Sequence, residues 1–70
     1  MEEIRAELVG NVWKIEVKPG DAVEEDQVLL ILESMKMEIP VVSSIAGKVA
    51  RILVAEQDVV REGQVLAEIE

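Results

Sequence analysis

One lysine in this sequence stands in a setting that suits covalent chemistry. Lys36 lies between two methionines in the tetrapeptide Ser-Met-Lys-Met, residues 34–37, and a glutamate flanks that tetrapeptide on each side. A lysine amine is a nucleophile that can form a covalent bond to a carbonyl carbon. The chain has no histidine and no cysteine, so the usual general base, the commonest metal ligand and the thiolate nucleophile are all missing. These residues predict an attachment point for another group, with no catalytic residue and no metal site in the chain.

The rest of the sequence is an internal repeat. A shift of 37 positions places Gly10 on Gly47 and Glu33 on Glu70, and about half of the pairs in this stretch are identical. The other identical pairs are Val12 and Val49, Ile15 and Ile52, Val17 and Val54, Asp21 and Asp58, Val23 and Val60, Glu25 and Glu62, and residues 27–29 with 64–66. Residues 34–37 have no counterpart, and a connector outside a repeat is a place where function sets the sequence.

The repeat also predicts where this connector lies. The two units cover residues 1–33 and 38–70 of a single domain, and two like units joined in this way pack about a pseudo-twofold axis. The axis brings the chain ends together and sends residues 34–37 to the far side as a hairpin tip. With Glu33 opposite Glu38, the turn falls on Met35 and Lys36, which both need a positive φ. That conformation costs such residues about 1 kcal/mol or more each, which indicates stability given up to present a side chain.

The secondary structure of residues 21–37 is predicted by comparing them with their copy in the second half of the chain. Residues 21–37 are rich in good helix formers, but the matching residues 58–70 contain Gly63 and several β-branched residues. If both copies share one structure, it is extended, and the frequent Gly, Pro and Ser breaks predict a small all-β fold. We expect strands at residues 2–7, 12–17, 28–33, 37–42, 49–54 and 65–69, with short pairing segments at 22–23 and 59–60.

Local patterns add three expectations about these strands. Residues 28–32 are continuously apolar, which is typical of a strand covered on both faces, as two sheets wrapped around each other would cover it. The apolar residues after Val12 do not alternate strictly, so we expect a bulge between Val12 and Ile15. Asp26 stands at the position of Gly63, and because Asp tolerates the left-handed region, both copies can keep the same turn.

Composition narrows the range of partners. The formal net charge is −8 and the seven basic residues are scattered singly, so the chain offers no stripe for nucleic acid. No apolar run reaches the roughly 20 residues that a membrane span needs, and the start Met-Glu-Glu is acidic where a secretory signal is basic. We expect a cytoplasmic protein with an aliphatic core and no membrane contact. Trp13, the only aromatic residue, matches Ala50 and is expected to be a partly covered structural residue.

At this point the sequence resembles a known family. Residues 33–38, Glu-Ser-Met-Lys-Met-Glu, are similar to the attachment motif Glu-Ala-Met-Lys-Met-Glu of biotin carboxyl carrier domains. Residues 10–15, the Pro-Gly-Asp turn at 19–21 and residues 63–66 resemble the framework of the same family, so the likeness covers essentially the whole chain. The resemblance implies a flattened β-barrel of two four-stranded antiparallel sheets with an internal pseudo-twofold repeat and the lysine on an exposed hairpin. The chain resembles a compact, stand-alone biotin/lipoyl attachment protein more than a long carrier subunit, and a C-terminal domain of a longer chain is the alternative.

The resemblance also implies roles for the residues of the tip. Lys36 would carry biotin as an amide, attached by biotin protein ligase. The ligase would recognise the residues that flank this lysine, which are Glu33, Ser34, Met35, Met37 and Glu38. Ser34 departs from the usual alanine, but both residues are small. The loaded domain would then move carboxyl groups between biotin carboxylase and carboxyltransferase sites, and it would raise the effective concentration of the cofactor at both.

Two other interpretations remain open at this stage. The first is a lipoyl carrier, which has the same fold and whose equivalent lysine carries lipoate for a 2-oxoacid dehydrogenase or a glycine cleavage system. Lipoyl sites more often have Asp before the lysine and a small residue after it, so Met35 and Met37 favour biotin. The second is an unmodified β-barrel interaction module, in which Lys36 would be an ordinary surface charge paired with Glu33 or Glu38.

Overall fold

The computed structural model describes residues 1–70 and contains eight β-strands. Their bounds are β1 Glu2–Arg5, β2 Gly10–Ile15, β3 Ala22–Val23, β4 Val28–Ser34, β5 Met37–Val42, β6 Gly47–Ile52, β7 Val59–Val60 and β8 Val65–Ile69. Each segment expected from the sequence is a strand, which confirms the all-β prediction. No helix in the structure is long and apolar enough to cross a membrane.

The expected ends of four strands were wrong. The strand expected at residues 28–33 continues one residue further, to Ser34. The strands expected at residues 12–17 and 49–54 each begin and end earlier, at Gly10–Ile15 and Gly47–Ile52, and the strand expected at 2–7 ends at Arg5. Gly10 is already in the ladder because it pairs with Val60 of β7. Val17 lies beyond the end of β2 and is still buried. An apolar residue at this position therefore made the sequence pattern look like a longer strand.

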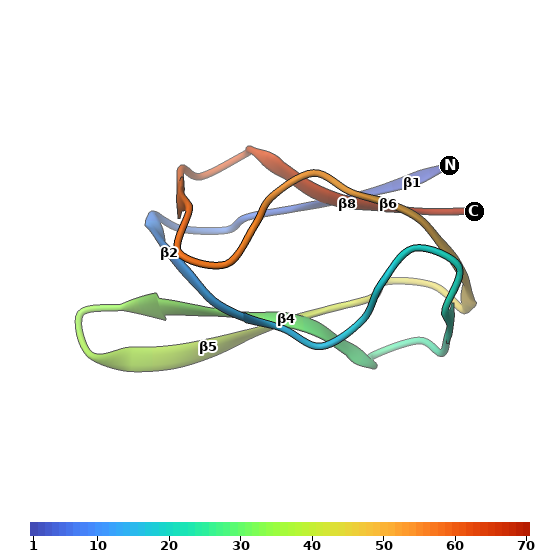
Figure 1. The fold of residues 1–70 in the computed structure, drawn as a ribbon, viewed down its shortest axis with the longest axis horizontal. Helices are drawn as coiled ribbons and strands as arrows, with labels where there is room; N and C mark the ends of the chain where they lie inside the picture. Colours follow the sequence, from blue (N-terminus) through green and yellow to red (C-terminus); the bar gives the residue numbers. More distant parts are fainter.

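Two four-stranded antiparallel sheets form the fold, and the repeat relates one to the other. The strand orders are β1-β8-β6-β3 and β5-β4-β2-β7. Exchanging each strand for its copy in the other half, β1 for β5, β2 for β6, β3 for β7 and β4 for β8, turns the first order into the second. The two sheets pack face to face as a flattened, unclosed barrel (Figure 1), as the internal pseudo-twofold repeat predicts. Each sheet takes two strands from each half of the chain.

Identical residues in the two halves make identical turn contacts. The carboxylate of Asp21 accepts a hydrogen bond from the Lys18 backbone N–H at 3.0 Å, and that of Asp58 accepts one from Ala55 N–H at 2.9 Å. In the next turns, the side-chain carbonyl oxygens of Gln27 and Gln64 accept hydrogen bonds from backbone N–H groups three residues before them. Asp and Gln recur in the repeat because their side chains satisfy backbone donors in these turns.

Positive φ values show how the turns tolerate sequence differences between the halves. Asp26 has a φ of 69° and Gly63 a φ of 86°, so Asp keeps the turn that glycine makes in the other copy, as expected. Gly20 has a φ of 96°, whereas its counterpart Gln57 adopts a φ of 78° without the freedom of a glycine.

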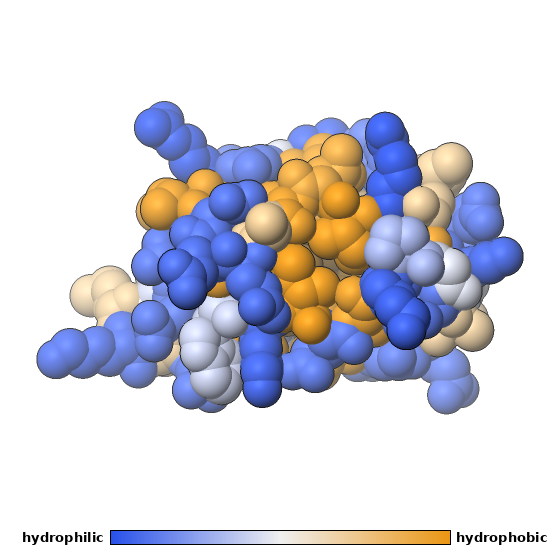
Figure 2. Space-filling model, viewed as in Figure 1, coloured by the Kyte–Doolittle hydropathy of each residue, from blue (hydrophilic) through white to orange (hydrophobic).

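The core lies between the sheets in two aliphatic clusters. One contains Leu29 with Val49 and Ile69, and the other contains Leu30 with Leu66 and further aliphatic residues. Leu29 and Leu30 are adjacent in β4 and both are fully buried in this core. The pairing of β4 with β5 shifts register between Val28 and Leu30, and such an irregularity lets successive side chains face the same side. On the face drawn in Figure 2, apolar side chains gather between the two sheets and hydrophilic residues surround them.

The expected bulge lies in β2. Val12 pairs with Leu32 and Lys14 with Ile31, so Trp13 is the extra residue without a partner on β4. Trp13 is 45% exposed, and the ammonium nitrogen of Lys14 lies 5.8 Å from the centre of its ring. The tryptophan is thus partly covered, as expected, at a separation typical of cation–π contacts.

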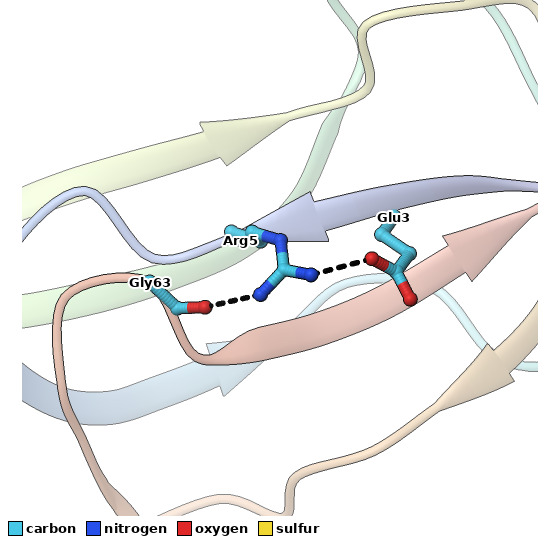
Figure 3. A network of polar contacts seen from close by, with 3 residues as sticks. All are labelled: Glu3, Arg5 and Gly63. Carbon is cyan, nitrogen blue, oxygen red and sulfur yellow. Dashed lines mark hydrogen bonds and ion pairs between the residues drawn. The ribbon is translucent and has the colours of Figure 1, made fainter.

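Arg5 fastens edge strand β1 to the turn before β8. Its Nη1 donates to the carbonyl oxygen of Gly63 at 2.6 Å, and its Nη2 donates to Oε1 of Glu3 at 2.6 Å (Figure 3). The first contact joins residues near opposite ends of the chain, while the second pair is solvent-exposed and adds little to stability. The bond to Gly63 is therefore the contact that ties the end of β1 to the turn before β8.

The chain ends meet at one end of the molecule and the β4–β5 hairpin lies at the other (Figure 1). Glu2 pairs with Ile69 in the antiparallel ladder of β1 and β8. The molecule measures 31 Å along its longest axis and 17 Å along each of the others, so the tip and the termini are far apart. This arrangement is the one that the pseudo-twofold axis requires.

A circular permutant tests this arrangement. We expect a chain that starts at Lys36, joins Glu70 to Met1 through a short linker and ends at Met35 to fold cooperatively, because facing residues such as Glu2 and Ile69 lie about 5 Å apart. Far-UV circular dichroism and urea unfolding measure this. The separate fragments 1–35 and 36–70 serve as controls and should not fold alone, because each sheet needs strands from both. A permutant without a cooperative transition would contradict the geometry.

Candidate functional site: the lysine hairpin

The site is the two-residue turn that joins β4 to β5. The ladder pairs Glu33 with Glu38 and Ser34 with Met37, which leaves Met35 and Lys36 as the two residues of the loop. Met35 has a φ of 53° and Lys36 a φ of 66°, close to the ideal left-handed value of about 57°. Both residues therefore adopt the conformation predicted from the sequence, in a turn type that favours Asn and Gly.

The two flanking strands impose the positive φ values of Met35 and Lys36. Antiparallel pairing continues up to Ser34 and Met37, so only two residues remain to reverse the chain. Two-residue loops adopt primed turns because those turns match the twist of the flanking strands. Neither Met35 nor Lys36 gains a local hydrogen bond that Asn or Asp would have made, so each carries a cost of about 1 kcal/mol or more.

The side chains of the tip point into solvent. Met35 is 92% exposed and Met37 is 62% exposed, and Lys36 is exposed as well. No ion pair or hydrogen bond joins the Lys36 amine to Glu33, Glu38 or any other residue. The expected surface salt bridge of an incidental lysine is thus not formed, and the amine is free to react or to bind.

Gly10 lies against the backbone at the base of the hairpin. From the sequence it was assigned only to the framework of the fold. A Cβ atom on Gly10 would lie 2.8 Å from the backbone oxygen of Glu33, which is closer than non-bonded atoms approach. Gly47, its copy, meets Glu70 in the same way. The close approach of β2 to β4, where the hairpin leaves the sheet, requires glycine at this position. The sequence indicated this requirement because glycine occurs in both copies of the repeat, at Gly10 and Gly47.

A shallow hollow lies beside this base. Asn11, Trp13, Glu33 and Gln57 line it, and its volume is about 390 Å³. Asn11 faces Glu33 across the ladder, so the hollow lies on the outer surface next to the acidic foot of the hairpin. The sequence-predicted residues Glu33, Ser34, Met35, Lys36, Met37 and Glu38 therefore lie together on one protruding element, and Trp13 stands near its foot.

These features define a class of protein. The fold is a small, rigid double sheet, and its most protruding element exposes one unpaired amine on a turn whose conformation favours other residue types. A rigid domain of this size with a lysine on an exposed turn has the architecture of a carrier domain.

Known proteins agree with this class. The sequence matches the family described as biotin-requiring enzyme over residues 3–69. It is 47% identical over 66 residues to the biotin/lipoyl attachment protein of Bacillus subtilis, a match that covers 94% of this chain and 90% of that protein. It is 44% identical over 68 residues to the biotinylated protein TB7.3 homolog of Mycobacterium leprae, covering 97% of this chain and 96% of that protein.

The fold is also similar to that of a solved structure. The fold matches part of the crystal structure of the Kluyveromyces lactis urea carboxylase with a TM-score of 0.94 and 36% sequence identity. The match covers 99% of this chain and only 6% of that protein, so this chain corresponds to a small part of the carboxylase. The chain belongs to the biotin/lipoyl attachment family, and it is a carrier domain of the biotin type.

The strain at the tip gives a testable consequence. Replacing Met35 with Asn should raise the free energy of unfolding by about 1 kcal/mol, because Asn adopts a positive φ at a lower cost than Met. Urea unfolding measures this as a higher midpoint at an unchanged slope. Met37→Asn is the matched control: Met37 is also exposed but lies in strand β5, so no gain is expected. Equal stability of Met35→Asn and the parent would show that the turn is not strained.

Proposed function

We propose that the amine of Lys36 is the biotin attachment point of this carrier domain and that the loaded domain serves a biotin-dependent carboxylase. One observation carries the proposal: the exposed, unpaired lysine occupies a strained turn between two methionines, Met35 and Met37, at the end of the molecule opposite the chain termini. The residues fit the group because the amine is free to form an amide and nothing around it restricts an attached arm.

The chain contributes positioning to the attachment reaction. A hairpin paired up to its last residue holds Lys36 at a fixed distance from the sheet, where an enzyme can enclose it. The nitrogen Nζ loses a proton, attacks the activated carboxyl carbon of biotin and displaces the adenylate, so one amide bond forms as one acyl–phosphate bond breaks. The ligase supplies the base, since no side chain of this hairpin contacts the Lys36 amine.

Three partners follow from this proposal. Biotin protein ligase would read the residues that flank Lys36, namely Glu33, Ser34, Met35, Met37 and Glu38. Biotin carboxylase and carboxyltransferase would then receive the loaded tip in turn. When bound, biotin supplies a ring that carries a carboxyl group from one site to the other. The net charge of −8 favours encounter with basic partner surfaces, and small contacts at the tip allow release after each visit.

Intact mass spectrometry tests the attachment directly. After co-expression with biotin protein ligase and biotin, the parent chain should gain the mass of one biotinyl group. Lys36→Arg, which keeps the charge and removes the amine, should show no gain. Lys14→Arg is the matched control and should be modified like the parent, because Lys14 lies in strand β2 beside Trp13 and away from the turn. Full modification of Lys36→Arg would overturn the proposal.

Lipoate is the second candidate group, because the family to which this chain belongs includes lipoyl attachment domains. The two methionines distinguish the groups. Met35→Asp should reduce biotin loading at least roughly tenfold, equivalent to about 1.4 kcal/mol, and should increase lipoate loading by a lipoate ligase. Parallel loading assays with both purified ligases measure this. If the parent chain accepts lipoate faster than biotin, lipoate is the native group and the biotin proposal fails.

A further inference from the structure

A groove runs between the two edge strands that flank the pseudo-twofold axis. Its volume is about 350 Å³, within the range of sites for small ligands. Strand β1 forms one wall and β5 the other, and four charged residues of the first wall, Glu2, Glu3, Arg5 and Glu7, also line the groove. The hydrophobic side chains along it are Ile4, Ala6, Leu8, Leu32, Ile39, Val41 and Val42. The groove exists because the sheets are not closed: β1 and β5 are both edge strands, and no backbone ladder joins them.

The two walls are copies of each other, yet they differ in character. Edge strands are commonly protected by charged residues, and β1 follows this rule while β5 does not. At three equivalent positions, β1 has Glu2, Glu3 and Arg5 where β5 has Ile39, Pro40 and Val42. Pro40 removes a backbone donor, which discourages pairing with a further strand, but it leaves the edge apolar. Because the fold places the same demands on both strands, the apolar character of β5 needs another reason.

Strand β5 connects the groove to the tip. Side chains two residues apart in a strand lie on the same face, so Met37, Ile39 and Val41 form one strip. Ile39 faces Leu32 across the ladder, and both line the groove. The strip is exposed at Met37 and half-buried at Ile39, so an apolar path leads from the turn into the groove without a charged residue on it.

The distances allow a group on Lys36 to use this path. Ile39 is three residues from Lys36, about 10 Å along an extended strand. A lysine that carries an acyl chain of biotin length has eleven bonds between its Cα atom and the ring, which span about 14 Å when extended. The arm is therefore long enough to turn back and lay its chain along Met37 and its ring at the mouth of the groove, near Leu8 and Ile39.

We infer that the acyl arm carried by Lys36 folds back along the Met37–Ile39 strip and rests in the β1–β5 groove when no partner protein is engaged. The inference rests on the proposed attachment at Lys36. Tethering makes the contact intramolecular, with an effective concentration of the order of millimolar, so a weak apolar contact is enough to populate the rested state. Because the contact between the arm and the groove is weak and small, the active site of a partner protein can displace the arm from the groove.

Nuclear magnetic resonance of the biotinylated chain tests the resting position. We expect nuclear Overhauser contacts from the methylene and ring protons of the arm to the methyl groups of Leu8 and Ile39. We expect no such contacts to Val59, an exposed valine on edge strand β7 that does not line the groove. Intact mass confirms loading beforehand. A chain that gains no mass overturns the proposed attachment itself, whereas a loaded chain without contacts to the groove overturns only this inference.

Streptavidin association gives an independent readout. Binding requires the free arm, so its rate scales with the fraction of arms outside the groove. Ile39→Ser should raise the rate roughly twofold to fivefold, and Val59→Ser should leave it unchanged. If Ile39→Ser fails to fold by circular dichroism, Leu8→Ser replaces it, since Leu8 is a half-buried loop residue on the opposite wall. Equal rates in the parent and the folded groove variant would overturn the inference.

Discussion

The exchange of strands between the two halves of the chain is the constraint on which everything else depends. Each sheet contains two strands from the first half and two from the second, so neither half can bury its apolar face alone. The backbone hydrogen bonds outside the ladders repeat in the same way: Glu16 N–H donates to Leu29 and Leu53 N–H to Leu66, both at 2.9 Å. Stability is therefore a property of the whole domain, and a rigid platform results from only 70 residues.

A connector between two units packed in this way has little freedom. It starts where β4 ends and must enter β5 at once, because these strands are paired up to Ser34 and Met37. The symmetry places the chain ends at the far end of the molecule, where Glu2 and Ile69 pair, so no other part of the chain covers the turn. Exposure of Lys36 thus follows from topology, whereas topology does not explain why Met and Lys stand in a turn type that favours Asn and Gly.

Positions at which the two halves differ indicate a demand other than the fold, because both halves have the same fold. Turn residues such as Asp21 and Asp58 agree, since both satisfy the same backbone donor. Strand β5 differs from its copy β1, and it is the strand that leaves the tip. In the arrangement we propose, the apolar edge beside Lys36 holds the attached arm, and the charged edge of β1 protects the other sheet from pairing with foreign strands.

The sequence by itself determined the eight strand segments, the bulge after Val12, the pseudo-twofold packing and the positive φ of Met35 and Lys36. These follow from periodicity, internal repetition and local backbone preferences, which are written in the order of residues. Only the tertiary structure decided that the Lys36 amine has no carboxylate partner, that Gly10 backs the hairpin and that β1 and β5 leave a groove between them. Such features depend on distances between segments far apart in the chain, and those distances are set only when the two sheets pack.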